Sequence, residues 1–265
     1  MKIHIISKIH CVVLLFTFTT LIGNGLSPTW AKECSYYNNA SISKTTNQLP
    51  LWATNKLNTL GENYRISAEG RKRLLQVLLM AQHKQVSLSL LISKIEEGLA
   101  KKVPPQIIAQ ALLKEIDNYC YVRNLLKTFF SCAPEKLISN KVVKTIVDSL
   151  SLGLSRKELA QFIKSAPIAP LSMLAIAIEN LALLKQIHFN PDMAKQIMFT
   201  GLRYKSFSSD WRYVAKIIAL AKKRNLSDKQ ITKAALQILR HKQHLNKLME
   251  LLGFTSRNLQ QNQFR

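Results

Sequence analysis

The thirteen residues GLRYKSFSSDWRY, Gly201 to Tyr213, combine basic and aromatic side chains at a density that could hold an anionic ligand. Guanidinium and ammonium groups bind phosphate or carboxylate, and aromatic rings bind sugar faces or cations. The residues available for such a site are Arg203, Tyr204, Lys205, Arg212 and Tyr213. The same stretch can instead be a turn between two helices, with Ser208 or Ser209 as the N-cap and Phe207 packed back on the preceding helix. The two interpretations are compatible, and the turn accounts for most of these residues without a ligand.

The sequence contains no catalytic signature. It has no H-E-x-x-H, no G-x-S-x-G and no glycine-rich phosphate loop. A weak candidate for acid–base chemistry is Glu179, which lies in the apolar stretch Leu171 to Leu184, because burial raises the pKa of a carboxyl group toward the range of a general acid. A glutamate in such a helix is more often found at the helix edge or beside a lysine. We therefore expect a protein without a cofactor and without catalytic residues.

Histidine and cysteine spacing gives no metal site. His241 and His244 stand at i and i+3, a spacing that can share a metal ion, but no carboxylate accompanies them, so we interpret them as part of a solvated helix face. Cys120 and Cys132 are twelve residues apart, at the end of a predicted helix and in the turn after it, and they are the best placed pair for a disulfide. Cys34 would then be free or intermolecular. The alternative is that all three remain reduced, buried thiols.

Residues 1–31 resemble a secretory signal peptide. Two lysines precede the uncharged apolar stretch Ile9 to Gly23, and small residues at Thr29 and Ala31 suit a cleavage site. This stretch is 15 residues long, whereas a membrane-spanning helix needs about 20. We therefore expect cleavage after Ala31, export to the periplasm or the exterior, and no transmembrane anchor in the mature chain.

Positive charge is the strongest signal in the sequence. The chain has 38 Lys and Arg against 15 Asp and Glu, a net charge of +23, which becomes +21 after loss of residues 1–31. The segment Lys195 to Arg265 alone carries 15 basic and 3 acidic residues. Such an excess is typical of proteins that bind anionic polymers, anionic lipid surfaces, acidic proteins or nucleic acids.

Helical spacing gathers these charges into two rows. One predicted helix, Ser208 to Arg224, carries Arg212, Lys216 and Lys223 on one face. The next, starting near Ser227, carries Lys229, Lys233 and Arg240 on its polar face and continues with apolar residues to Leu252. Neighbouring antiparallel helices could merge the rows into one basic surface, so Lys216, Lys223, Lys229, Lys233 and Arg240 join the candidate ligand-binding set that already includes Arg212.

Local patterns predict an almost wholly helical chain. Ser155 with Glu158, and Ser227 with Gln230, form capping boxes, and other starts are expected near the following residues: Ser67, Ser87, Pro104, Pro134, Pro170, Asn190 and Ser208. We expect four segments: a signal peptide (1–31), a flexible Ser/Asn/Thr-rich arm (32–65), a helical domain (66–254) and a polar tail (255–265). Two helices occupy about 38 residues, which is typical of helical-hairpin repeats.

The sequence thus predicts an all-α fold of eight to ten amphipathic helices, either a degenerate α-solenoid or a compact orthogonal bundle. As function we expect an exported, non-catalytic binding or scaffold protein, whose basic C-terminal face holds an anionic envelope partner. That partner would be a polymer, lipid headgroups or an acidic protein. The alternatives are an enzyme acting on envelope polymers and, if the chain is not exported, a nucleic-acid-binding protein. High lysine content can also serve solubility alone.

Overall fold

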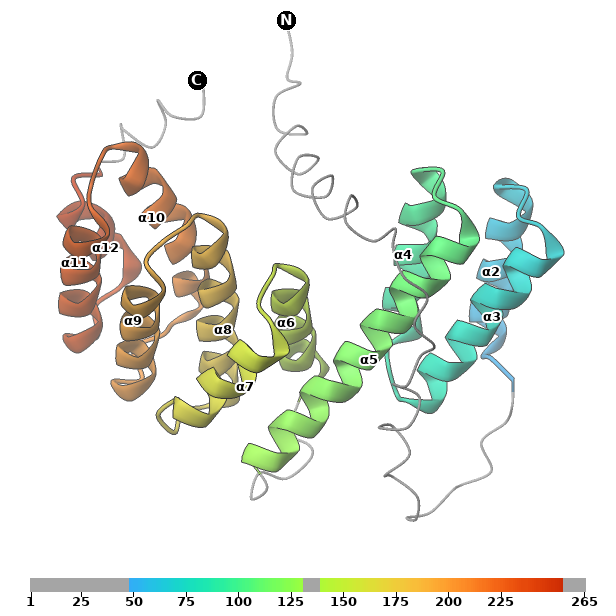
Figure 1. Ribbon diagram of the computed structural model, residues 1–265, viewed down its shortest axis with the longest axis horizontal. Coiled ribbons are helices and arrows are strands. Elements are labelled where there is room, and N and C mark those ends of the chain that lie inside the picture. The colour runs from blue at the N-terminus through green and yellow to red at the C-terminus, as the bar shows by residue number, and fades with distance from the viewer. Residues whose placement is uncertain (1–47, 131–138, 255–265) are drawn as a thin grey trace, which may run out of the picture. The chain divides into compact units, whose positions relative to one another are not determined.

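Helices make up almost all of residues 48–130 and 139–254, the parts of the chain that the computed structural model describes (Figure 1). The prediction of an all-α fold is confirmed. The described residues form these helices: α2 Leu51–Asn63, α3 Ala68–His83, α4 Leu88–Ala100, α5 Pro105–Phe129, α6 Asn140–Ser151, α7 Arg156–Ser165, α8 Leu171–Gln186, α9 Pro191–Arg203, the 3-10 helix η3 Ser209–Tyr213, α10 Val214–Lys223, α11 Asp228–Arg240 and α12 Leu245–Leu251.

Helix contacts follow a simple rule along the described chain. Each extensive contact joins helices that are neighbours in sequence or next but one. Thus α3 packs against α5, α5 against α7 and α9 against α11, while α2 packs against α4, α6 against α8 and α8 against α10. Such contacts are those of helical hairpins stacked in two layers, so the α-solenoid describes the arrangement better than the orthogonal bundle.

One type of turn connects most of these helices. After α3, the Val86 N–H donates to Ala81 O (2.8 Å) and the Gln85 N–H donates to Gln82 O (3.0 Å), with Gln85 in the left-handed region at φ 55°. This pair of bonds is a Schellman motif, which satisfies carbonyls left unpaired at the end of a helix. The same pair follows α2, α4, α6, α8, α9, α10, α11 and α12.

The turns recur with a fixed spacing. Three pairs of left-handed residues lie 37 residues apart, each pair separated by two helices: Arg65 and Lys102, His188 and Asn225, Lys205 and Lys242. This agrees with the 38-residue hairpin expected from the sequence. The repeat is degenerate, because α5 has 25 residues and the α7-to-α8 connection has no left-handed residue.

Basic side chains tie one hairpin to the next. Arg123 of α5 donates to the carbonyls of Lys84 and Gln85 (2.7 and 2.6 Å) at the end of α3. In the same way Lys185 of α8 donates to Gly153 O (3.0 Å) after α6, and Lys222 of α10 donates to His188 O (2.9 Å) after α8. A cation is favourable there, because the C-terminal carbonyls form the negative end of a helix dipole.

Most of the predicted helix starts agree with the structure. Both capping boxes, at Ser155 and Ser227, are present with reciprocal hydrogen bonds. Asn190 accepts from the N–H groups of residues 192 and 193, and Ser67 caps α3. Ser87 stands at the N-cap of α4 but makes no capping bond, since its hydroxyl lies against Ser89 instead (2.9 Å).

The stretch at Gly201 is a turn, as the simpler interpretation predicted. Phe207 and Trp211 are buried, with ring centroids 5.6 Å apart, and a Cβ on Gly201 would lie 2.2 Å from the Phe207 ring. Glycine is therefore required for this close approach. The expected capping by Ser208 or Ser209 is wrong in its detail: Ser208 occupies the N-cap position of η3, but its hydroxyl bonds the Asp210 carboxylate rather than a helix N–H.

Three expectations need correction. Helix α2 lies within the segment 32–65 that was predicted as a flexible arm, because Ala53, Leu57 and Leu60 recur at helical spacing and are buried. The helix starting at Ser227 ends at Arg240, and α12 is a separate helix, because Lys242 adopts φ 51°. Cys120 lies well inside α5 rather than at its end.

Several predictions fall outside the described residues. These are the signal peptide (1–31), the helix start at Pro134, Cys34, Cys132 and the tail (255–265). The proposed Cys120 to Cys132 disulfide therefore stays a prediction. The described chain resumes at residue 139. There Ser139 is the N-cap of α6, and its side chain accepts a hydrogen bond from the Val142 N–H.

The left-handed turns predict opposite effects for two substitutions. Gly153→Ala places a side chain at φ 97° with no atom within 4 Å of the new Cβ, so the cost is conformational, about 1 kcal/mol. Lys102→Gly relieves the same strain at φ 58° and should leave the free energy of unfolding unchanged or raise it by up to about 1 kcal/mol. Urea denaturation measures both. Equal losses of stability in the two variants would contradict this account of the turns.

Candidate functional site

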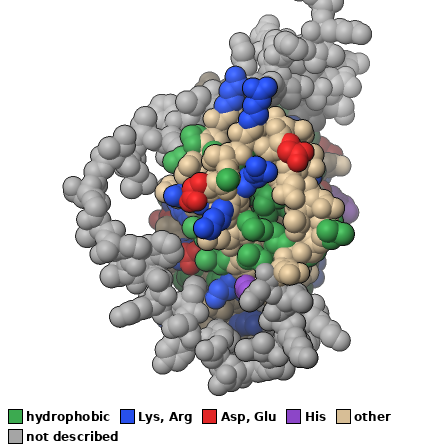
Figure 2. All heavy atoms as spheres, turned by 90° about the vertical axis from the view of Figure 1, so that its right-hand side faces the viewer, with side chains coloured by type: hydrophobic (Ala, Val, Ile, Leu, Met, Phe, Trp, Pro, Cys, Tyr) green, Lys and Arg blue, Asp and Glu red, His purple; other side chains and the backbone are tan. Residues whose placement is uncertain are grey.

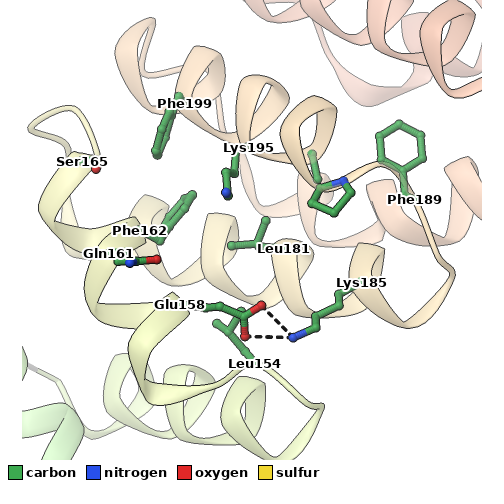
Figure 3. A pocket seen from close by; sticks show the side chains of 12 residues that line it. Leu154, Glu158, Gln161, Phe162, Ser165, Leu181, Lys185, Phe189, Lys195 and Phe199 are labelled. Atoms are coloured by element: carbon green, nitrogen blue, oxygen red, sulfur yellow. Dashed lines mark hydrogen bonds and ion pairs between the residues drawn. The ribbon is translucent and has the colours of Figure 1, made fainter.

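A largely apolar cavity of about 450 Å³ lies between α7 and α9, with α8 beneath it. We call it the α7/α9 cavity. Phe162 of α7 and Phe199 of α9 stack on each other at one side of it, with ring centroids 5.0 Å apart, and Lys195 extends from α9 toward the same space (Figure 3). Other lining residues are Leu154, Glu158, Gln161, Ser165, Leu181, Lys185, Phe189, Pro191 and Ala194.

The charges at one end of this cavity neutralise each other. The Lys185 ammonium donates to both oxygens of the Glu158 carboxylate, at 2.8 Å each (Figure 3). This bond from Lys185 is the main reason that the pKa of Glu158 falls to about 2; burial opposes the fall and the bonds from Ser155 assist it. Both groups are therefore engaged within the protein and leave little charge for a ligand.

Lys195 is held much more loosely. Its ammonium lies 3.8 Å from the Asp192 carboxylate, and the side chain of Asp192 is 93% exposed. An ion pair at this distance and exposure contributes almost nothing to stability. The Lys195 charge is thus available at the border of an apolar cavity.

A second hollow, of about 400 Å³, opens on the other side of α9. We call it the α9/α11 cleft; its lining residues are Asp192, Lys195, Gln196, Phe199, Thr200, Arg203 and Arg240. Three cations stand there against one carboxylate. Lys195 and Phe199 line both hollows, so the cavity and the cleft flank the exposed ridge of α9.

The structure brings together two of the predicted ligand-binding residues, Arg203 and Arg240. They come from α9 and α11, which pack against each other. Tyr204 and Lys205 continue from Arg203 into the turn after α9.

The other predicted residues divide between helices. Lys229 and Lys233 are exposed on α11, the helix that carries Arg240. Arg212 and Tyr213 lie in η3, and Lys216 and Lys223 on α10, which packs against α8. All are exposed, but none of the residues from η3 and α10 lines the α9/α11 cleft. The two predicted rows therefore belong to different helix pairs.

Sequence reasoning missed Lys195, Phe199 and Phe162. A signal was present on α9, where Asp192, Lys195, Phe199 and Arg203 recur every three or four residues and so share one helix face. Phe162 gave no such signal, because its partner Phe199 belongs to a different hairpin.

Glu179 has the raised pKa that its apolar helix suggested. Burial raises it, with Asp148 adding to the rise, while Arg212 and Lys144 oppose the shift. The residue lines neither the α7/α9 cavity nor the α9/α11 cleft. His241 and His244 do not share a helix as expected, because they flank the turn between α11 and α12. The described residues contain no group of three or more His, Cys, Asp or Glu side chains that could hold a metal ion.

Other surfaces of the described chain have a different character. The hollow between α3 and α5, also about 400 Å³, carries the charged residues Glu69 and Arg73, which pair with each other at 3.1 Å. At the end of the molecule formed by α2 and α3, apolar side chains gather among charges of both signs (Figure 2). The hollow between α3 and α5 therefore lacks the excess of cations found beside α9.

Comparisons with known proteins find no relative. No protein family model and no curated protein matches the sequence, and no solved structure matches the fold. Across the part of the chain that the structure describes, no helix is both long enough and apolar enough to span a membrane.

The Glu158 to Lys185 pair predicts a pH-dependent loss of stability. Because the folded pKa of Glu158, about 2, lies below its ordinary value of 4.5, the stabilisation is complete above about pH 5 and declines as pH falls toward 2. The Glu158 side chain is 42% exposed, so solvent screening limits the effect of Glu158→Gln to about 1 kcal/mol or less at pH 7. The difference from wild type in urea denaturation should shrink between pH 5 and pH 3.

The second capping box supplies the control. Gln230→Ala removes an uncharged partner of Ser227, so its cost should not change over the same pH range. A pH-independent effect of Glu158→Gln would show that the Lys185 ion pair contributes nothing.

Proposed function

We propose that this chain is an exported, non-catalytic helical-repeat protein that binds an acidic protein partner through the α9/α11 cleft. The observation that carries the proposal is the charge of the cleft: Lys195, Arg203 and Arg240 stand against one carboxylate, which is exposed and 3.8 Å from its nearest cation. Two arginines from different helices suit carboxylates, because a guanidinium donates two parallel hydrogen bonds to one carboxylate.

The surroundings of the cleft favour a protein over the other anionic partners expected from the sequence. A polysaccharide or a lipid headgroup layer presents repeated charge and would be matched by a continuous basic surface. Here the cations adjoin a separate apolar cavity, and protein interfaces combine such apolar anchoring with a charged rim. Stacked helical hairpins also commonly bind proteins along the grooves between successive helices.

Four further predicted residues extend the same charged region. Tyr204 and Lys205 follow Arg203, and Lys229 and Lys233 precede Arg240 on α11. Exposed cations around a site accelerate association more than they strengthen the complex. We assign this steering role to Lys205, Lys229 and Lys233, with Arg203 and Arg240 making the direct contacts and Tyr204 offering an exposed ring beside them.

Charge reversal at two places tests the proposal. The probe is a fluorescein-labelled decapeptide of Glu, Gly and Ser, and binding is measured by fluorescence anisotropy at 150 mM salt. Arg203→Glu with Arg240→Glu should weaken binding at least tenfold. The matched control is Lys216→Glu with Lys223→Glu on α10, which changes the net charge equally and should weaken binding less than threefold.

Three other outcomes would contradict the proposal. Equal losses in the two double variants would mean that net charge, and not the cleft, attracts the peptide. Absence of binding by the wild-type chain would remove the cleft as an acidic-peptide site. Tighter binding of a single-stranded oligonucleotide, with affinity falling by about 0.7 log unit per phosphate contact for each log unit of salt, would make nucleic acid the partner.

A further inference from the structure

We propose that the α7/α9 cavity and the α9/α11 cleft form one composite site for an extended acidic peptide. In this site a bulky apolar side chain of the peptide enters the cavity, and a carboxylate about three residues away along the peptide lies in the cleft. The inference rests on the proposed function and adds to it a sequence pattern that the partner must contain.

The cavity is built to receive one apolar group. Phe162 and Phe199 stack on each other, with ring centroids 5.0 Å apart and an angle of 26° between their planes, and together form one wall. Leu181 of α8 also lines the cavity. A volume of about 450 Å³ falls in the range of ligand pockets, which are mostly apolar with a few polar groups at the edge. An aromatic side chain fits best, since it can pack edge-on or offset against the two rings.

The border of the cavity offers polar groups for a peptide backbone. Gln161 and Ser165 are exposed on α7, and Lys195 is exposed on α9 opposite them. An amide side chain and a hydroxyl can donate to and accept from main-chain groups, which an acyl chain or a sugar acid does not present in the same pattern. A peptide can therefore fill the apolar interior of the cavity with a side chain and form hydrogen bonds with the polar groups at its border through its backbone.

Lys195 and Phe199, which line both hollows, determine how far apart the apolar side chain and the carboxylate of the peptide must be. Because Lys195 and Phe199 line both hollows, a ligand that leaves the cavity reaches the cleft by crossing α9 alone. Packed helices lie about 8–10 Å apart, and an extended chain advances about 3.3 Å per residue. About three residues therefore separate the apolar side chain from the carboxylate that meets Arg203 and Arg240.

The charge of the chain argues against a second copy as the occupant. Each chain carries a net charge of +23, and 15 of the 18 charged residues from Lys195 onward are basic. Two such surfaces repel each other, whereas an acidic peptide is attracted to the loosely paired Lys195.

Peptides of varied spacing test the composite site. The probes are fluorescein-labelled decapeptides of Gly and Ser that contain two adjacent Glu residues and one Phe, placed either three or eight positions away, and a third peptide with Ala instead of Phe. On the wild-type chain the three-position peptide should bind at least tenfold more tightly than the Ala peptide, the advantage expected for burying a phenyl group. The eight-position peptide should lose about fourfold of this advantage, because the effective concentration of a tethered group falls with about the −3/2 power of linker length.

A blocking variant locates the apolar contact. Gln161→Trp adds a ring at the exposed rim of the cavity and should reduce the advantage of Phe over Ala to less than threefold. The readout is the ratio of the two affinities, because loss of the Gln161 contact with the peptide backbone affects the Phe and Ala peptides equally. Ser165→Trp, at another rim position on α7, serves as a second blocking variant if the first does not fold. Circular dichroism and the melting temperature verify folding. Arg203→Glu with Arg240→Glu should weaken binding of all three peptides.

The possible failures are distinguishable. If all peptides bind alike and remain sensitive to the cleft variant, the composite site is wrong and the acidic-partner function stands. If no peptide binds, both fall. If vesicles of phosphatidylglycerol displace the Phe peptide and lose this ability in Gln161→Trp, the cavity takes an acyl chain and the peptide proposal is overturned.

Discussion

The left-handed turn at the end of nearly every helix is the constraint on which the rest of this structure depends. Each turn uses two backbone hydrogen bonds to satisfy helix carbonyls and reverses the chain within a few residues. The residue after the left-handed position is usually apolar and buried, as Val86, Leu154 and Phe189 are, so the turn is also anchored in the core. Repeating this unit fixes the direction of most successive helices and therefore packs α9 against α11. The α7-to-α8 connection lacks this turn, and α7 contacts α9 through the Phe162 and Phe199 rings.

Part of the positive charge has a structural role. Arg123, Lys185 and Lys222 each bind backbone carbonyls at the end of a helix in the preceding hairpin, and Lys222 also pairs with Asp228 at 3.3 Å. Arg224 binds in the opposite direction along the chain, donating to Gly253 O after α12 at 3.0 Å while its guanidinium covers the Phe254 ring. These cations are committed within the protein, so net charge alone overstates the charge available to a partner. In the cleft, Arg203 and Arg240 are not committed in this way, and they line one hollow together.

Local chemistry explains what the sequence could predict. Capping boxes at Ser155 and Ser227 involve residues three positions apart, so their geometry follows from the sequence directly. Helix α12 was missed because its preceding turn has Lys242 in the left-handed position and the polar Gln243 after it, without the Gly or apolar residue that usually marks such a turn. Helix α2 was missed because the Ser, Asn and Thr residues before it obscured a short apolar stripe.

The site could be predicted only in part. Arg203 and Arg240 were identified from charge, but their meeting in one cleft depends on how α9 packs against α11, which no local pattern encodes. The stacking of Phe162 on Phe199 has the same origin. In both pairs the two residues are 37 positions apart in the sequence, and they become neighbours only because the hairpins repeat with that period. A site between repeats can therefore be predicted from the sequence only when the period of the turns is known.

The neighbour-only contacts between hairpins have a mechanical consequence. Because α12 and α11 are held mainly by the elements beside them, the C-terminal end can fray while the remaining hairpins stay folded, as in other stacked repeats. A ligand that contacts α7, α9 and α11 together would oppose this fraying, because unfolding of α11 would then also break contacts with the ligand. Amide hydrogens of α11 would then exchange more slowly in the complex, although most of them never touch the ligand.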